Sequence, residues 1–260
     1  MLDCYIINLD RAADRWKNVS EKFSSLGFNV IRFSAIDGQM LQVPHPDFSA
    51  WKYFFYYGRP AVPTKIACYF SHIEVLKAFL ETDRDHAMIC EDDIFPQPEC
   101  LDVVRNAMRY SDSWDLLRLN GIKPTRGFDF IDLLHGYHLC CDLKTASGNG
   151  AKIVNRRAAE IIVNKCLPMR LPHDVTLFYD WPIGIREMTV QPFPILLNET
   201  LCTNSTIGTE PRYPLWHPAT LRHFISLPYR VCSRTTRKIS RICWAMQNRV
   251  WPPQPRKTEF

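Results

Sequence analysis

Three consecutive carboxylates, Glu91, Asp92 and Asp93, are the residues of this chain whose type and spacing point most directly to chemistry. They follow residues 87–90, a short apolar run with the length of a buried strand. Acids this close repel one another unless positive charge lies between them. Divalent cations such as Mg²⁺ and Mn²⁺ prefer carboxylate oxygens and share them with substrate phosphates. The pattern therefore predicts a metal that holds a diphosphate; the alternative is an exposed turn or helix start, where acids are also favoured.

Further polar residues lie where predicted strands end, or on the helix that precedes the acids. Residues 3–9 and 28–33 predict buried strands, and the helix between them completes a β-α-β unit with parallel strands. In such sheets, ligands bind beyond the carboxyl ends of the strands. We therefore expect a nucleotide site lined by Asn8, Asp10 and Arg15 after the first strand, Asp37 and Gly38 after the second, and Ser71 and His72 on the helix.

Some of these residues also have a plainer structural explanation. Arg15 can pair with a neighbouring acid on the surface of its helix. Asp37 and Gly38 form a common turn sequence, and His72, among apolar neighbours, can be a core residue whose ring is hydrogen-bonded.

The remaining pattern alternates helices and strands and predicts an α/β fold with a single Rossmann-like, mostly parallel sheet flanked by helices. Helices are expected at 65–80, 100–109 and 156–167 and after Pro172, and strands at 114–120, 147–154 and 190–197. Residues 39–63 are rich in aromatic residues and proline. They predict an irregular insertion that either shapes an acceptor pocket or covers the edge of the sheet.

Charge divides the chain into an acidic body and a basic tail. Residues 211–260 contain ten Lys and Arg and one acid, a net charge of +9, which leaves −4 for residues 1–210 of a chain whose total is +5. We therefore predict a catalytic domain over 1–210 and a separate tail over 211–260. An acidic body without a nucleic-acid-binding motif disfavours a nucleic-acid partner.

The tail predicts an amphipathic helix over roughly 229–250, with apolar residues on one face and arginines on its flank. Basic amphipathic helices adhere to anionic membrane surfaces; the alternative is a helix packed on the body. The first residues lack the pattern of a signal peptide, and no segment has the roughly 18 consecutive apolar residues of a membrane span. Cysteines within apolar runs predict reduced core residues. Together these observations predict a cytoplasmic protein, peripheral on the inner face of the cytoplasmic membrane.

The order of these motifs resembles glycosyltransferase family 25, the lipopolysaccharide and lipooligosaccharide sugar transferases. The motifs are Ile7-Asn8-Leu9-Asp10-Arg11 with Asp14-Arg15, Ala35-Ile36-Asp37-Gly38, Lys65 to His72, Glu91-Asp92-Asp93, Gly148-x-Gly150 and Pro172-x-Asp174. The resemblance covers about residues 1–200 and implies a GT-A fold, a nucleotide-sugar donor and a divalent metal, usually manganese. Lys152 stands where the family more often has tyrosine, and residues 39–63 match no family motif.

The resemblance also implies roles for individual acids. Asp93 would bind the metal directly, and Glu91 would bind the ribose or a metal-bound water. Asp174 matches a late acid of the family and is our candidate for the general base that an inverting transferase needs; the alternative is a helix N-cap.

We therefore predict a metal-dependent transferase, with Mn²⁺ or Mg²⁺, that moves a hexose from a UDP-hexose, galactose from UDP-galactose, onto a glycan or glycolipid acceptor. One rival function is nucleotidyl transfer, which usually uses a glycine-rich loop after the first strand; here that loop has no glycine. The other is a non-catalytic relative that binds nucleotide or glycan.

Overall fold

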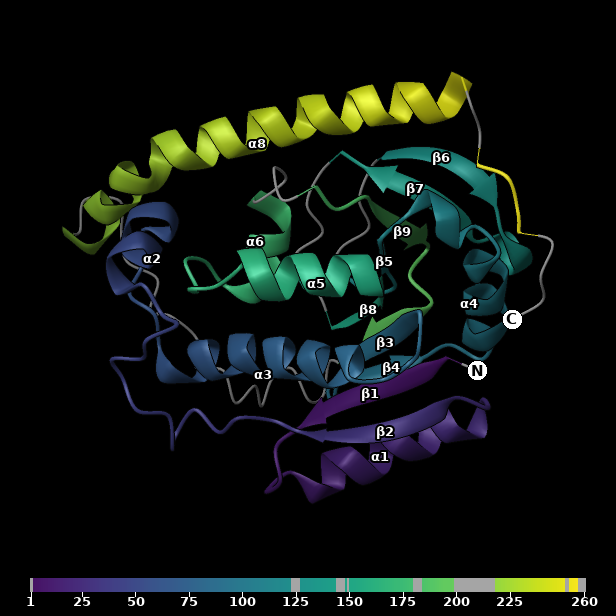
Figure 1. The fold of residues 1–260 in the computed structure, drawn as a ribbon, viewed down its shortest axis with the longest axis horizontal. Coiled ribbons are helices and arrows are strands. Elements are labelled where there is room, and N and C mark those ends of the chain that lie inside the picture. The colour runs from purple at the N-terminus through teal and green to yellow at the C-terminus, as the bar shows by residue number, and fades with distance from the viewer. Residues whose placement is uncertain are drawn as a thin grey trace.

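The computed structural model describes residues 2–122, 127–143, 148, 150–179, 184–198, 218–250 and 253–256. Within these ranges, helices lie on both faces of one large sheet (Figure 1). The helices are α1 (Ala13–Ser25), α2 (Ala50–Tyr57), α3 (Pro63–Leu80), α4 (Cys100–Met108), α5 (Arg156–Lys165), α6 (His173–Tyr179) and α8 (Pro218–Val250). The strands are β1 (Asp3–Asn8), β2 (Asn29–Ser34), β3 (His86–Glu91), β4 (Ile94–Pro96), β5 (Leu116–Arg118), β6 (Gly127–Asp132), β7 (His138–Asp142), β8 (Ala151–Asn155), β9 (Glu187–Gln191) and β10 (Ile195–Leu197).

The amino-terminal β-α-β unit forms as its sequence predicts. The strands β1 and β2 are parallel, with Asp3 opposite Asn29. Between them, α1 buries Val19 and Phe23, one turn apart, and is followed, after its C-cap Leu26, by Gly27, whose φ of 89° suits a residue without a Cβ. β3 pairs with the other side of β1, also in parallel. The carboxyl ends of β1, β2 and β3 therefore meet at one edge of the sheet.

The prediction of a mostly parallel sheet is wrong, because eight of the described strands form a mixed sheet in the order β2-β1-β3-β8-β5-β9-β7-β6, while β4 and β10 pair with each other. β8 runs antiparallel between β3 and β5, and β7 runs antiparallel to both β6 and β9. A strand buried on both faces is apolar along its whole length whichever way its neighbours run. Its sequence therefore does not reveal its direction.

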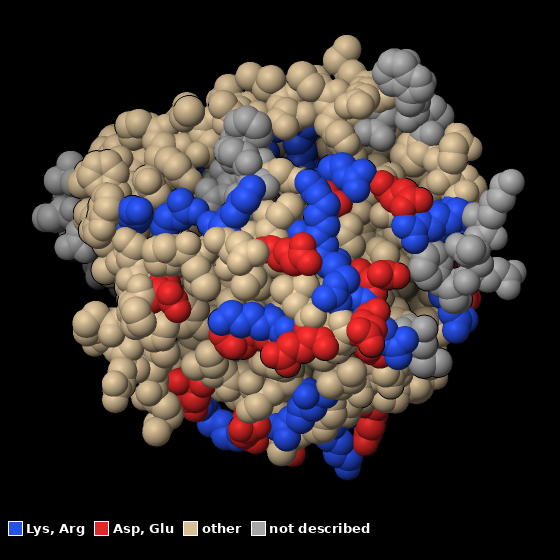
Figure 2. Space-filling view, viewed as in Figure 1, with Lys and Arg blue, Asp and Glu red and all other residues tan. Residues whose placement is uncertain are grey.

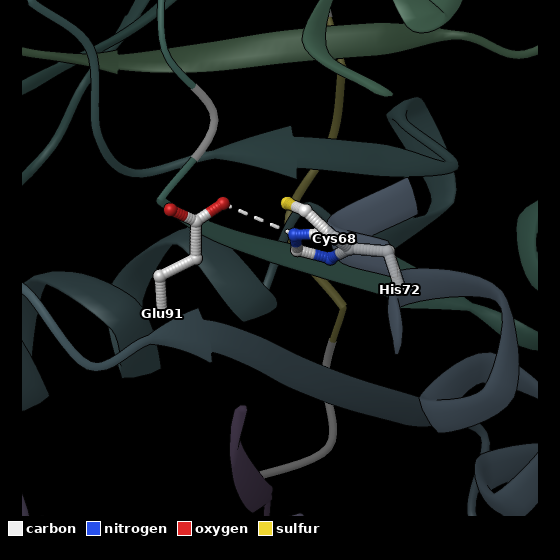
Figure 3. A group of neighbouring side chains, drawn as sticks. All are labelled: Cys68, His72 and Glu91. Atoms are coloured by element: carbon white, nitrogen blue, oxygen red, sulfur yellow. Dashed lines mark hydrogen bonds and ion pairs between the residues drawn. The ribbon is translucent and has the colours of Figure 1, made fainter. Parts of the chain in front are cut away.

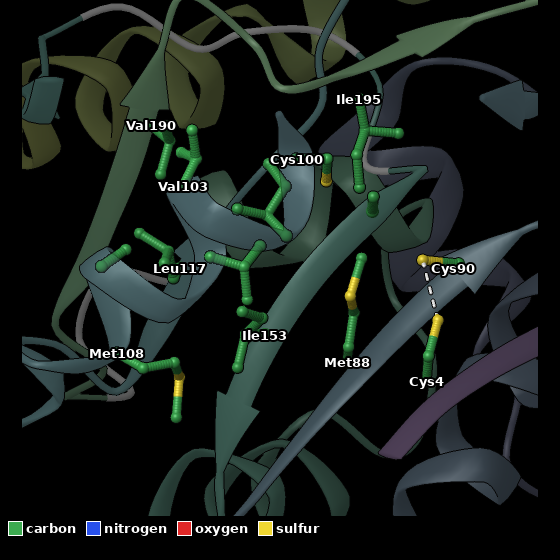
Figure 4. Close-up of a cluster of buried hydrophobic side chains, with 14 of the residues drawn as sticks. Cys4, Met88, Cys90, Cys100, Val103, Met108, Leu117, Ile153, Val190 and Ile195 are labelled. Carbon is green, nitrogen blue, oxygen red and sulfur yellow. Dashed lines mark hydrogen bonds between the residues drawn. The ribbon is translucent and has the colours of Figure 1, made fainter. Parts of the chain in front are cut away.

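Each face of the sheet carries its own apolar core. Alternate residues of β3 divide between them, since Met88 and Cys90 pack with α1 and α4 while Ala87 and Ile89 pack with α3 and α5. Figure 4 shows the first core, in which the buried thiols of Cys4 and Cys90 lie 3.9 Å apart. This double burial explains why residues 87–90 are apolar without alternation.

Two other predictions need adjustment. Residues 39–63 contain α2, whose Tyr53 is buried in the second core, so part of the expected irregular insertion is a helix. The predicted late strand is two strands, β9 and β10, with a cis Gln191-Pro192 bond between them.

The predicted tail helix begins earlier than expected, at Pro218, and runs across the top of the molecule above α2, α6 and β6 (Figure 1). This helix packs on the body, which is the second of the two arrangements that the sequence allowed for the tail. No helix of the described residues has the length and apolar character needed to cross a membrane.

Candidate active site

A cavity at the carboxyl ends of β1, β2 and β3 collects most of the predicted site residues. It is lined by Ile7, Leu9, Arg11, Arg15, Ala35, Ile36, Asp37, Gly38, Thr64, Cys68, Ser71, His72, Glu91, Asp92 and Asp93. The strand register explains the gathering, because Ile7 at the end of β1 lies opposite Glu91 at the end of β3. A larger cavity of about 420 Å³ lies at the other end of these strands, near Leu2 and His86, and is lined by none of the predicted residues.

The three consecutive acids have different surroundings. Glu91 ends β3, and its Oε1 lies 3.1 Å from His72 Nε2. Both oxygens of Asp92 are engaged, one by Asn8 Nδ2 at 2.7 Å and the other by Arg15 Nη1 at 3.1 Å. Asp93 Oδ1 is buried and accepts no hydrogen bond from any described residue. Asp93 therefore has an oxygen available for a ligand, whereas Asp92 is held by the protein.

Negative charge is in excess around Asp93. Burial, then the carboxylates of Glu91 and Asp92, raise the pKa of Asp93 to about 7, although Arg15 opposes the shift. Burial also raises the pKa of Glu91. A half-buried carboxylate with one buried, orphaned oxygen, beside two further acids, fits a divalent cation, which would supply the missing positive charge.

Asn8 and Asp10 contribute to the site in different ways. The amide of Asn8 is buried and saturated: Nδ2 donates to Asp92 and to the carbonyl of Ala12, and Oδ1 accepts from Arg32 at 2.7 Å. Asn8 thus fixes the position of Asp92. Asp10 is exposed, accepts a bond from Ser34 Oγ at 2.7 Å, and does not line the cavity.

The loop after β2 forms the opposite wall of the cavity. Asp37 pairs with Arg11 and accepts a hydrogen bond from the backbone N–H of Gln39 at 2.9 Å. A Cβ on Gly38 would lie 2.5 Å from the Cα of Thr64, so only glycine lets this loop approach the start of α3. Ser71 Oγ accepts from the N–H of Ile36 at 2.9 Å, which ties the same loop to α3. Nucleotide binding by these residues stays a prediction.

His72 connects Glu91 to a buried lysine. Lys152, on β8, is fully buried, and its Nζ lies 3.2 Å from His72 Nδ1 and 2.9 Å from His173 Nε2. The imidazoles of His72 and His173 are stacked, with centroids 3.9 Å apart. Burial lowers the pKa of Lys152 to about 8, and Glu91 opposes that shift. Burial and Lys152 together hold the pKa of His72 well below its ordinary value.

These contacts select one arrangement of protons. An ammonium at Lys152 donates to Nδ1 of a neutral His72, so the His72 proton lies on Nε2 and points at Glu91 (Figure 3). Lys152 thereby orients Glu91 through His72. Sequence reasoning placed His72 in the site but gave Lys152 no role there; the available signal was a lysine within an otherwise apolar strand.

Cys68, His72 and Glu91 form a second group with metal-ligand chemistry, since their ligand atoms all lie within 4.8 Å of one another (Figure 3). Burial and then Glu91 raise the pKa of the Cys68 thiol well above its usual range, and His72 Nε2 is engaged with Glu91. A protonated thiol and an occupied imidazole are poor ligands for a hard cation. The carboxylates therefore fit Mn²⁺ or Mg²⁺ better than this group does.

Asp174, in the first turn of α6, does not line the cavity. It is near enough to the acids for electrostatic coupling: burial, then Glu91, raise its pKa, while Arg118 opposes the shift. A raised pKa suits a proton acceptor that must work near neutral pH. Its role as a base stays a prediction.

Comparison with known proteins gives a family match to the amino-terminal half. The profile of glycosyltransferase family 25 (LPS biosynthesis protein) matches residues 1–135. Two relatives, a glycosyltransferase 25 family member from Aedes aegypti and one from Anopheles gambiae, are 28% and 27% identical over 122 residues. The match covers 44% of this chain and 20% of each relative, so the chain spans about a fifth of the length of these curated relatives.

Two solved structures are weakly similar, each at 11% identity. One is a glycosyltransferase involved in the glycosylation of the major capsid of PBCV-1, with a TM-score of 0.40 over 88% of this chain and 98% of that one. The other is A197 from STIV, with a TM-score of 0.42 over 82% of this chain and all of that one. Likenesses of this size support no inference about the site.

Proposed function

The chain belongs to glycosyltransferase family 25, and from this premise we propose that it is a metal-dependent hexosyltransferase of the GT-A type. Its donor is a UDP-hexose, UDP-galactose in the first instance, and its acceptor is a lipopolysaccharide, lipooligosaccharide or other glycan on the cytoplasmic side of a membrane. Transfer inverts the anomeric centre. Residues 1–210 form the catalytic domain, and residues 211–260 form a basic tail whose helix α8 packs on it.

The observation that carries this proposal is the buried, unpartnered Oδ1 of Asp93 beside Glu91 and Asp92. Asp93 and Glu91 would hold a divalent cation, which when bound neutralises the charge of the departing nucleoside diphosphate. Arg11 and Arg15 line the same cavity and add positive charge on the side of β1 and β2. A cavity with carboxylates on one wall and arginines on another suits a metal-bound diphosphate.

The chain also contains a candidate for the proton acceptor. An acceptor hydroxyl must lose its proton as it attacks the anomeric carbon of the donor, and the raised pKa of Asp174 makes this carboxylate a competent base. Lys152, acting through His72, keeps Glu91 oriented at the cavity during the reaction.

Calorimetric titration of the full chain with UDP, UDP-galactose, UDP-glucose and UDP-N-acetylglucosamine, each with and without Mn²⁺, tests the donor. Release of UDP from the donor, to water or to an added glycan, measures turnover. We expect Mn²⁺-dependent UDP binding. Asp93→Asn should lower turnover by about 10²–10³-fold without lowering the melting temperature, and Asp174→Asn should keep UDP affinity but lose turnover.

Asp132→Asn provides a matched control, because the Asp132 side chain is 90% exposed on β6. If the protein binds no UDP whichever divalent cation is added, the proposal is contradicted. Metal-dependent UDP binding without any release of UDP would instead identify a non-catalytic relative, and equal losses of affinity and turnover in Asp174→Asn would assign that acid a structural role.

A further inference from the structure

The carboxy-terminal helix α8 packs polar as well as apolar side chains on the body and turns a row of large apolar side chains outward. Its buried side chains include Ser226, Ser233, Arg237 and Ala245. Its exposed side chains include Phe224, Ile225, Leu227, Val231, Ile239 and Met246, which are between 42% and 63% exposed. A helix that only covers a soluble domain shows the opposite arrangement, so the fold itself does not account for the apolar face.

The inward side is held by ion pairs as well as by apolar contact, since Trp244 packs on the first core and against Phe130 of β6. Arg241 and Arg237 reach Glu187 at the start of β9, and Arg241 Nη1 also donates to the carbonyl of Glu187 at 3.1 Å. At the amino-terminal end, Tyr229 stacks on Tyr56 of α2 with centroids 4.2 Å apart. These contacts fix the rotation of α8 about its axis and hold the apolar side away from the body.

Positive charge lies along one edge of the exposed apolar stripe. Arg230, Arg234 and Lys238 are spaced four residues apart and therefore lie along one flank of α8. The helix contains no Asp or Glu. In the space-filling view the upper edge of the molecule, over α8, is nearly free of charged side chains, and Lys and Arg gather below it (Figure 2).

We propose that α8 is a membrane-docking helix that lies in the interface of an anionic bilayer, with its apolar stripe among the lipid chains and its basic flank at the headgroups. An apolar stripe flanked by cations is the pattern of interfacial helices. A nucleic-acid surface would match the cations but would leave the stripe in water. The inference does not depend on the transfer reaction.

Point variants test this better than removal of the helix, since deleting α8 would also remove Arg237 and Arg241 from the interior. Flotation with vesicles of phosphatidylcholine, with and without 30% phosphatidylglycerol, measures binding of the full chain. We expect binding to the anionic vesicles only. Combined Val231→Gln, Ile239→Gln and Met246→Gln should weaken it by about tenfold or more. Arg234→Gln with Lys238→Gln should also weaken it by about tenfold or more.

The matched control is Leu134→Gln with Leu196→Gln, which changes exposed leucines outside α8 and should leave vesicle binding unaltered. Unchanged partitioning of the α8 triple variant overturns the proposal. So does a wild-type chain that ignores anionic vesicles but forms dimers that the triple variant loses, because the stripe would then be an interface between two copies. Donor hydrolysis by the triple variant, measured without vesicles, should equal that of the wild type.

Discussion

Two clusters of charged side chains in this protein have opposite balances. Around Glu187, one buried carboxylate accepts hydrogen bonds from Arg118 at 2.8 and 3.0 Å and pairs with Arg237 and Arg241. In the cavity at the ends of β1 and β3, three carboxylates lie near one another, and Arg15 donates a hydrogen bond to Asp92 at 3.1 Å.

The pKa values follow these balances. Burial alone would raise the pKa of Glu187, but Arg241, Arg118 and Arg237 outweigh it and lower the pKa to about 2. Burial and neighbouring acids raise the pKa of Asp93 to about 7. A carboxylate surrounded by arginines stabilises the fold, because its charge is already compensated. A carboxylate that lacks compensation and faces a cavity is placed to receive a cation.

The largest effect is expected where the compensated cluster is broken. Glu187→Gln removes the carboxylate that pairs with Arg237 and Arg241, so buried positive charge loses its close partner. The free energy of unfolding should fall by about 3–5 kcal/mol. Urea denaturation followed by circular dichroism measures it, with Asp93→Asn, which should not be destabilised, as the contrasting variant.

Turnover per folded molecule distinguishes the clusters further, since Glu187→Gln should keep it and Asp93→Asn should not. A second buried acid, Asp142 on β7, lies near enough to act electrostatically on Arg237 and Arg241. If the free energy of unfolding of Glu187→Gln falls by less than about 1 kcal/mol, Asp142 compensates the arginines and the contrast between the two clusters fails.

The same contrast explains what the sequence could reveal. The acids at 91–93 were found because they directly follow an apolar run, and the strand register then places Glu91 beside the end of β1. The β-α-β unit and α3 were predictable because their apolar residues recur at regular spacing. The direction of the strands was not predictable, because β8 is apolar on both faces apart from Lys152 and nevertheless pairs antiparallel with β3 and β5.

The partners of Arg237 and Arg241 could not be predicted either. The sequence predicts both arginines on the solvent-exposed flank of a basic helix. In the structure they pair with Glu187, some fifty residues earlier in the chain. Only the packing of α8 on β9 brings them together. The role of Lys152 could not be predicted for a similar reason, since its contacts with His72 and His173 join residues from three separate elements.

Lys152 offers a smaller and sharper test of the uncompensated cluster. Lys152→Met keeps the length of the side chain but removes the proton donor that holds His72 Nδ1. Partners that orient a metal ligand typically contribute 10–100-fold to affinity or activity, so Mn²⁺ affinity should fall by about that factor. The free energy of unfolding should change little, because an apolar side chain replaces a fully buried ammonium. Calorimetric Mn²⁺ titration and urea denaturation measure the two quantities.

His173→Gln serves as the control for Lys152→Met, because it removes the other partner of Lys152 and the ring stacked on His72 but keeps the groups that hydrogen-bond from Lys152 through His72 to Glu91. Equal losses of Mn²⁺ affinity in both variants, or a large loss of stability in Lys152→Met alone, would make Lys152 a structural residue.

The smallest effect concerns pH, and the two clusters should respond with opposite signs. The lowered pKa of Glu187 means that its stabilisation is complete above its ordinary pKa and is lost as the pH falls towards 2. The raised pKa of Asp93 means that the folded, metal-free protein favours the protonated acid, so stability from this group decreases as the pH rises from about 4 through 7. A cation requires the ionised carboxylate, and its affinity should therefore rise about tenfold between pH 6 and pH 8. Calorimetric Mn²⁺ titrations at pH 6, 7 and 8 measure this. A flat profile would mean that Asp93 is already ionised at pH 6, and its orphaned oxygen would then have a partner that compensates it as fully as the arginines compensate Glu187.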